Sequence, residues 1–126
     1  MPSYKNFTFP LNVYAHILCK DYGDFEYLHY GLFEQDDEQD IQKAQQRATD
    51  LFFLHIPACP CRILKVGIGL GTTLSKLVKA GYDATGITPD ENQINYAKNR
   101  YGENLPVFCQ RSVSYTHLTL PTKRIV

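Results

Sequence analysis

The 126-residue sequence has no net charge and no long hydrophobic run, and each absence excludes a class of function. Lys and Arg together number 13, as do Asp and Glu, so no basic field indicates a nucleic-acid partner. No apolar run reaches the roughly 18 residues needed to cross a bilayer. Met1–Phe9 also lacks the apolar core of a secretory signal. We therefore expect a cytoplasmic chain of one domain, with no integral membrane segment.

Cysteine is sparse and irregularly placed, at Cys19, Cys59, Cys61 and Cys109. This usage is typical of a reducing compartment. Cys59 and Cys61 lie near His55, but one intervening residue is not the spacing of a zinc CxxC pair, and no second pair follows. We expect ordinary thiols beside a strand and no metal site.

What the sequence does contain is a short apolar run that stops at three alternating glycines. Residues 62–66 read Arg-Ile-Leu-Lys-Val, Gly67, Gly69 and Gly71 follow, and a helical pattern begins at Thr72. A buried strand, a glycine turn and a helix start in that order indicate a nucleotide-binding crossover. Glycine allows positive φ and a close approach of backbone to ligand, and the helix start offers free N–H groups.

Periodicity and capping residues predict the other elements. Helices are expected over 11–21, from the acidic patch 34–40 to about 54, from 72 to Gly81, and from 88 to 101. Thr88 is expected to cap the last of these helices, with Pro89 at its first position and Glu91 closing a capping box. Strands are expected over 62–66, 83–87 and 106–110. From residue 62 the order is strand, helix, strand, helix, strand, which is half of a doubly wound sheet.

Residues 62–110 resemble motif I and the following segment of the class I S-adenosylmethionine-dependent methyltransferases. Within that family they are most similar to the branch of the cyclopropane-fatty-acid and mycolic-acid synthases. Residues 67–71 (Gly-Ile-Gly-Leu-Gly) match GxGxG, and 86–93 are similar to the branch's Gly-x-Thr-x-Ser-x-x-Gln. Upstream, 33–37 with Ala44 and Gln45 are similar to the branch's lead-in to its helix.

The resemblance implies an α/β fold, the N-terminal half of a Rossmann-like class I methyltransferase. Three parallel strands with flanking helices would follow an N-terminal helical segment. The expected division is a helical lead-in and cofactor cover (1–56), the cofactor-binding half (57–111) and a non-native tail (112–126). The implied function is transfer of a methyl group from S-adenosylmethionine to an unknown small-molecule or lipid acceptor. Modification of a fatty acyl lipid, as by cyclopropane synthases, is the alternative within the branch.

The resemblance also implies a set of cofactor-binding residues. The glycine turn would hold the methionine part and ribose of the cofactor. A pair of residues that follows the second strand would lie near the ribose and adenosine. An aromatic residue of the lead-in would cover the cofactor. These positions are Gly67, Ile68, Gly69, Gly71, Thr88, Gln93 and Tyr30, with His29 as the alternative to Tyr30. The catalytic residues and the oligomeric state stay unassigned.

Two positions depart from the family pattern. Lys65 stands where most relatives carry Asp or Glu, and a cation there should weaken the binding of a sulfonium cofactor unless its side chain points away. Thr88 stands where an acidic residue usually accepts from both ribose hydroxyls. The branch tolerates the second change.

Simpler interpretations remain for each of these residues. The glycines could serve helix–sheet packing alone, Thr88 could be only a helix cap, Gln93 could be solvated, and His29 and Tyr30 could be packing residues. An NAD site is disfavoured because the third glycine of GxGxxG would fall at Thr72. The expected acidic residue would fall near Ile87, which is apolar. A non-catalytic α/β module that has lost its ligand is the remaining alternative, and Lys65 is the residue that favours it.

The last residues break the pattern. Val113–Thr122 has no apolar period and resembles a translated sequencing adapter, so we expect 112–126 to be non-native. The native chain would then continue past Arg111 with further strands, and the sheet edge beyond the first strand would be open. On this interpretation the chain binds cofactor weakly and has no turnover.

Overall fold

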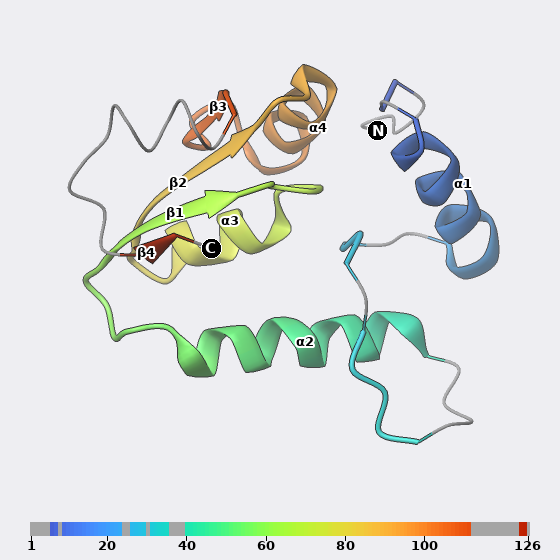
Figure 1. Ribbon diagram of the computed structural model, residues 1–126, viewed down its shortest axis with the longest axis horizontal. Coiled ribbons are helices and arrows are strands. Elements are labelled where there is room, and N and C mark those ends of the chain that lie inside the picture. Colours follow the sequence, from blue (N-terminus) through green and yellow to red (C-terminus); the bar gives the residue numbers. More distant parts are fainter. Residues whose placement is uncertain are drawn as a thin grey trace.

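The computed structural model describes residues 6–7, 9–23, 26–29, 31–35, 40–111 and 124–125, with backbone only for Tyr22 and 124–125. Helices and strands alternate after two initial helices (Figure 1). In chain order they are α1 (Leu11–Tyr22), α2 (Ile41–His55), β1 (Arg62–Val66), α3 (Thr72–Lys79), β2 (Asp83–Thr88), α4 (Glu91–Tyr101), β3 (Val107–Cys109) and β4 (Arg124–Ile125). The predicted helices and the first three strands are therefore confirmed, with ends shifted by a few residues.

The strands form one parallel sheet in the order β3-β2-β1-β4. The register places Arg62 beside Asp83 and Val66 beside Ile87, so β1 and β2 end together. The predicted open edge is wrong along part of β1, because β4 pairs there with Ile63 and Leu64. A short strand suffices for this, because an exposed parallel edge presents unpaired backbone groups to any extended segment.

The main core lies between the sheet and the helices α3 and α4. Its centre is formed by side chains with no more than a few per cent of their surface exposed, among them Ile63, Leu74, Leu77 and Ala97. Phe52 and Phe53 of α2 pack against the same core. Burying each large aliphatic side chain stabilises the fold by about 1.5–3 kcal/mol, so this core fixes the position of the turn between β1 and α3.

Helix α1 forms a second core at the end of the molecule toward which β1 and β2 point (Figure 1). Ala15 and Leu18 of α1 pack there against Leu70 and Tyr96, and Phe7 meets Tyr96 edge-on at 5.4 Å between ring centroids. The N-terminal segment is thus held against the loop that follows β1. Cofactor-binding sites of parallel sheets lie at this end of the strands.

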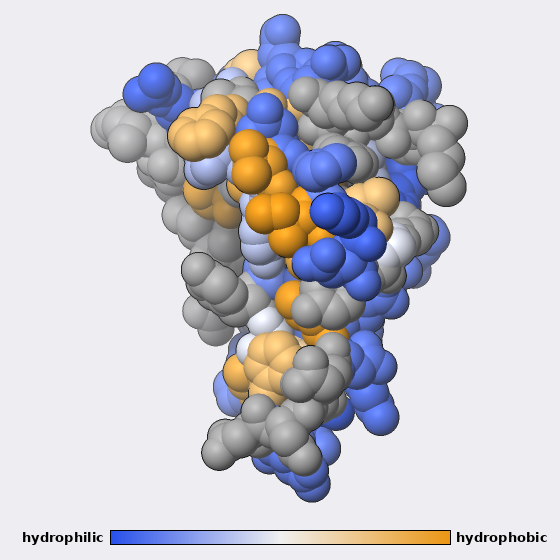
Figure 2. Space-filling view, turned by 90° about the vertical axis from the view of Figure 1, so that its right-hand side faces the viewer, coloured by the Kyte–Doolittle hydropathy of each residue, from blue (hydrophilic) through white to orange (hydrophobic). Residues whose placement is uncertain are grey.

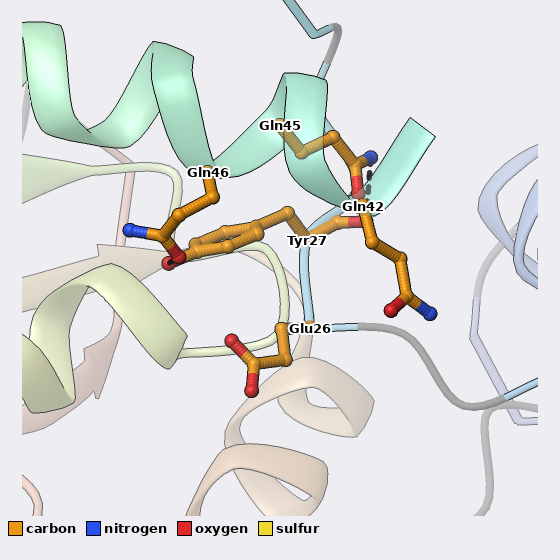
Figure 3. Close-up of a pocket in the computed structure, with 5 residues that line it drawn as sticks. All are labelled: Glu26, Tyr27, Gln42, Gln45 and Gln46. Carbon is orange, nitrogen blue, oxygen red and sulfur yellow. Dashed lines mark hydrogen bonds between the residues drawn. The ribbon is translucent and has the colours of Figure 1, made fainter. Parts of the chain in front are cut away.

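The segment after α1 is tied to α2 by Gln45, a buried amide. Its Nε2 donates to the carbonyl oxygens of Tyr27 (3.1 Å) and His29 (2.8 Å), and the residue is 1% exposed. Figure 3 shows the amide of Gln45 pointing at the backbone of this segment. A buried carbonyl without a donor costs about 1–3 kcal/mol.

We therefore expect Gln45→Met, which keeps the length of the side chain, to lower the free energy of unfolding by about 2 kcal/mol. Lys43→Met on the same helix is the control, because the side chain of Lys43 is exposed. Urea unfolding followed by circular dichroism measures both. Equal midpoints for the two variants would contradict the anchoring role of Gln45.

Candidate functional site

A broad cleft of about 990 Å³ opens at the carboxyl ends of β1 and β2. Its walls come from the glycine turn, the β2–α4 loop and the N-terminal segment. The lining residues are Phe9, Pro10, Leu11, Leu28, His29, Gly67, Gly69, Thr88, Pro89, Asp90, Glu91, Asn92, Gln93 and Cys109. Four of the predicted positions, Gly67, Gly69, Thr88 and Gln93, are therefore brought to one cavity.

The glycine turn divides into cleft and packing positions. All three glycines have positive φ, at 73° for Gly67, 56° for Gly69 and 86° for Gly71. A Cβ added to Gly67 or Gly69 would meet nothing within 4 Å, and both residues line the cleft. A Cβ on Gly71 would lie 2.6 Å from the Cβ of Ala97. Packing alone therefore explains Gly71 but does not explain the other two glycines.

Ile68, also predicted at the site, places its side chain in the core instead. It is 4% exposed and belongs to the main core cluster. Its carbonyl oxygen accepts from the N–H of Gly71 at 2.8 Å, which closes the turn. Ile68 thus shapes the turn through its backbone, while neither Ile68 nor Gly71 lines the cleft.

Thr88 and Gln93 form a buried polar pair at the end of β2. Thr88 is 2% exposed and Gln93 7% exposed. The hydroxyl of Thr88 accepts from the N–H of Asp90 at 3.2 Å and donates to Gln93 Oε1 at 3.0 Å. Because the amide oxygen is held by Thr88, the Nε2 of Gln93 is the end of the amide left for other acceptors.

The predicted capping role of Thr88 is wrong. Helix α4 begins at Glu91, and its N-cap is Asp90, whose Oδ1 accepts from the N–H of Asn92 at 2.9 Å. Asp90 has extended backbone angles, so the helix starts two residues later than the motif suggested. The solvated interpretation of Gln93 is wrong as well, because its side chain is buried against Thr88.

Of the two aromatic candidates in the lead-in, Tyr30 lies outside the described residues and His29 lines the cleft. His29 Nε2 lies 3.2 Å from Thr49 Oγ1 of α2, and its ring stacks obliquely on Tyr27 at 4.7 Å between centroids. His29 therefore reaches the cleft while it is held by α2.

Lys65 does not point away from the glycine turn. Its Nζ donates to the carbonyl oxygen of Gly67 at 2.8 Å. Burial lowers the pKa of Lys65 below its ordinary value, because desolvation disfavours the ammonium form. Lys65 is thus hydrogen-bonded to a residue that lines the cleft, although Lys65 is not itself among the lining residues.

The apolar wall from the N-terminal segment was not predicted. Phe9, Pro10, Leu11 and Leu28 line the cleft, and Phe9 is 75% exposed. Figure 2 views the molecule from the side of α1 and shows apolar surface gathered in a band between hydrophilic regions. Val13 and Ile17 are about half exposed. The period of α1 gave the helix correctly, but only the tertiary contacts show which face of it is buried.

A second, smaller cavity of about 300 Å³ lies between the lead-in and α2 (Figure 3). It is lined by Glu26, Tyr27, Gln42, Gln45 and Gln46. Gln46 Oε1 accepts from the hydroxyl of Tyr27 at 3.2 Å and from Lys76 Nζ at 3.0 Å. These contacts join the lead-in to α2 and α3, so we assign this cavity a structural role.

Within the described ranges, no cluster of three or more His, Cys, Asp or Glu side chains could hold a metal ion. Over the same part of the chain, no helix combines the length and apolarity required for a membrane span.

Comparison with known proteins gave matches among solved structures only. No protein-family model and no curated protein matches the chain. The chain is similar to the [4+2]-cyclase SpnF, with a TM-score of 0.63 and 23% identity over 85% of this chain and 40% of that one. It is also similar to the mycolic acid cyclopropane synthase CmaA1 complexed with SAH and CTAB. There the TM-score is 0.55 and the identity 29%, over 76% of this chain and 35% of that one.

These likenesses confirm the predicted fold: the chain has part of the Rossmann-like class I methyltransferase fold, with a helical segment before it. The chain spans less than half the length of either structure. One neighbour is named a cyclase and the other a cyclopropane synthase, so the shared fold does not by itself define a reaction.

Proposed function

We propose that this chain is the cofactor-binding part of an S-adenosylmethionine-dependent methyltransferase. The observation that carries the proposal is the division of the glycine turn. The space that a Cβ would take is open at Gly67 and Gly69, which line the cleft, whereas at Gly71 it is occupied by the Cβ of Ala97. Helix packing requires glycine only at Gly71, while Gly67 and Gly69 take positive φ and leave room for a ligand to lie against the backbone.

The cleft residues fit an adenosyl cofactor. Gly67 and Gly69 would face its amino-acid part, and Gln93 would present Nε2 to an acceptor on the ribose or adenine. His29 and the apolar wall of Phe9, Pro10 and Leu11 would restrict water on the opposite side. The fit draws support from CmaA1, whose structure was determined with SAH, S-adenosylhomocysteine.

When bound, S-adenosylmethionine would supply an electrophilic methyl group on a sulfonium. The described residues contribute binding, orientation and exclusion of water, which are the main requirements of an in-line displacement. We assign no catalytic base among them. The domain roles follow the same proposal: 1–56 as lead-in and cover, 57–111 as cofactor-binding half and 112–126 as a non-native tail.

The acceptor is proposed only as a small molecule or a lipid. The alternative within the branch is a cyclopropane-synthase-like modification of a fatty acyl chain, which CmaA1 favours by its name. The exposed apolar side chains of Phe9, Val13 and Ile17 near the cleft are compatible with either class. We propose a cytoplasmic location for the protein.

The proposal is tested by titrating the 126-residue chain with S-adenosylhomocysteine and, separately, with NADH. We expect the first ligand to raise the melting temperature in a concentration-dependent way, because a ligand that binds only the folded state stabilises it. NADH should leave the melting temperature unchanged, because an NAD site needs an acidic residue at the end of the second strand to bind the ribose. This chain has Ile87 and Thr88 there.

Stabilisation by NADH alone would replace the proposal with a nicotinamide site. Absence of any effect from both ligands up to millimolar concentrations would favour the non-catalytic module.

A further inference from the structure

The connecting segment between α1 and α2, described over residues 26–29 and 31–35, supplies part of the cleft wall. Leu28 and His29 line the cleft, and the segment runs past the first turns of α2 (Figure 1). Among the described residues that line the cleft, none belongs to α2. Helix α2 therefore acts on a ligand in the cleft through the position of this segment.

Gly31 lies closer to α2 than a residue with a side chain could lie. A Cβ there would be 2.5 Å from the Cβ of Ala44, 2.8 Å from the carbonyl carbon of Ala44 and 2.9 Å from the backbone nitrogen of Gln45. Two of these atoms belong to the backbone of α2, so no side-chain rotation relieves the collision. Gly31 is not among the glycines with positive φ, so this position requires glycine for space and not for backbone conformation.

Hydrogen bonds on both sides of Gly31 hold the connecting segment in this place. The N–H of Leu32 donates to the carbonyl oxygen of Ala44 at 2.8 Å, and the amide of Gln45 donates to the carbonyl oxygen of His29 at 2.8 Å. Ala44 and Gln45 are buried, at 0% and 1% exposed. The backbone of the segment is thus bound to α2, while His29 still lines the cleft.

We propose that Gly31 is a positioning residue for the ligand cleft, because its missing side chain lets the connecting segment dock on α2 and so places Leu28 and His29 in the cleft wall. This inference rests on the proposed adenosyl site and adds to it a residue that does not itself line the cleft. A methyl group at Gly31 pushes the segment off Ala44, and the displacement reaches His29 two residues earlier. The wall then no longer has the shape that fits the ligand.

The test compares the affinity for S-adenosylhomocysteine of the wild-type chain, Gly31→Ala and Ile63→Val, measured by calorimetric titration below the melting temperature of each. We expect Gly31→Ala to lower the affinity by about tenfold, because binding groups must be held within about 0.5 Å of their productive positions. Ile63→Val is the control, because it removes a methyl group from the main core near the end of β1 that lies away from the cleft. Its melting temperature should fall while its affinity stays that of the wild type.

A double-mutant cycle with His29→Ala distinguishes positioning from general stability. We expect His29→Ala alone to lower the affinity by about fivefold, and the double variant by about tenfold, as Gly31→Ala does alone. The reason is that Gly31→Ala has already removed the contact of His29 with the ligand. Independent effects would instead multiply to about fiftyfold.

The outcomes separate this inference from the function on which it rests. If the wild type binds the ligand and Gly31→Ala binds it equally well, or if the two effects multiply, the positioning role is overturned and the adenosyl site stands. If the wild type does not bind the ligand, the adenosyl site is overturned and the positioning role with it.

Circular dichroism melting verifies that each variant is folded. If Gly31→Ala does not fold, Gln45→Met carries the test, since it releases the carbonyl oxygen of His29 without crowding Gly31. This variant should also bind the ligand more weakly than the wild type. Unchanged affinity would overturn the inference, because docking on α2 would then not govern the cleft wall.

Discussion

Gly71→Ala is expected to lower the free energy of unfolding by about 3 kcal/mol, which is a large part of the 5–15 kcal/mol typical of a whole domain. Two costs add at this position. Gly71 has φ of 86°, where an L side chain costs about 1–2 kcal/mol. The new Cβ would also lie 2.6 Å from the Cβ of Ala97, and such overpacking costs about 1–3 kcal/mol.

A double-mutant cycle separates the two costs of Gly71→Ala. Ala97→Gly removes the Cβ atom that the new methyl group would meet. Glycine inside α4 itself lowers the free energy of unfolding by about 1 kcal/mol. The double variant should therefore be more stable than the sum of the two single changes predicts. Urea unfolding of all four chains gives the coupling energy. A loss below 1 kcal/mol for Gly71→Ala, or no coupling with Ala97→Gly, would contradict the packing role of this glycine.

The arrangement of β1, α3, β2, α4 and β3 could be predicted because local signals agree with the global fold there. The apolar run 62–66 ends at glycines, and helix α4 ends just before its C-cap Gly102, which has φ of 115° and donates its N–H to the carbonyl oxygen of Lys98. Each boundary is set by residues close in sequence, and a single sequence contains that information. Thr88 and Gln93 were assigned to the site by the family resemblance instead, and both line the cleft together with Gly67 and Gly69.

What the sequence could not supply depends on contacts between distant segments. The apolar spacing of α1 did not distinguish Val13 and Ile17, which are about half exposed, from Leu18, which is buried against Leu70 and Tyr96. Which face of an amphipathic helix is covered depends on its partner. The apolar wall of the cleft follows from the same docking, so no local pattern indicated it.

Thr88 illustrates how two local signals can compete. A Thr-Pro-x-Glu sequence is a good helix start, but Asp90 lies two residues later and is a stronger cap than threonine. With Asp90 as N-cap, the hydroxyl of Thr88 is available to Gln93, which is then buried rather than solvated. The correction of the cap therefore strengthens the polar pair in the cleft.

Lys65 could be recognised as a departure from the family pattern, but its direction could not be predicted. A strand-end lysine can extend into solvent or turn back on its own strand, and both fit the same sequence. The Nζ of Lys65 donates to the carbonyl oxygen of Gly67, and burial lowers the pKa of the side chain.

Gly69→Ala is expected to separate ligand binding from folding, in contrast to Gly71→Ala. Gly69 has φ of 56°, so alanine costs about 1–2 kcal/mol of stability. Its Cβ would meet no atom within 4 Å, so no packing cost is added and the chain stays folded. The methyl group would instead project at the cleft that Gly69 lines. The steric cost of one methyl group against a closely packed ligand is about 1–3 kcal/mol, which lowers the affinity roughly 5–150-fold.

The affinity for S-adenosylhomocysteine, measured by calorimetric titration, should accordingly fall by about 10–100-fold in Gly69→Ala. Gly102→Ala is the matched control: it too has positive φ and open space, but it lies at the far end of α4, outside the cleft lining. Its φ of 115° and ψ of 149° lie in a region that is nearly restricted to glycine, so this variant should lose at least as much stability and still keep full affinity. If Gly69→Ala bound the ligand as well as Gly102→Ala did, the open space at Gly69 would not be a ligand site. The glycine turn would then be explained by the conformation of the chain alone.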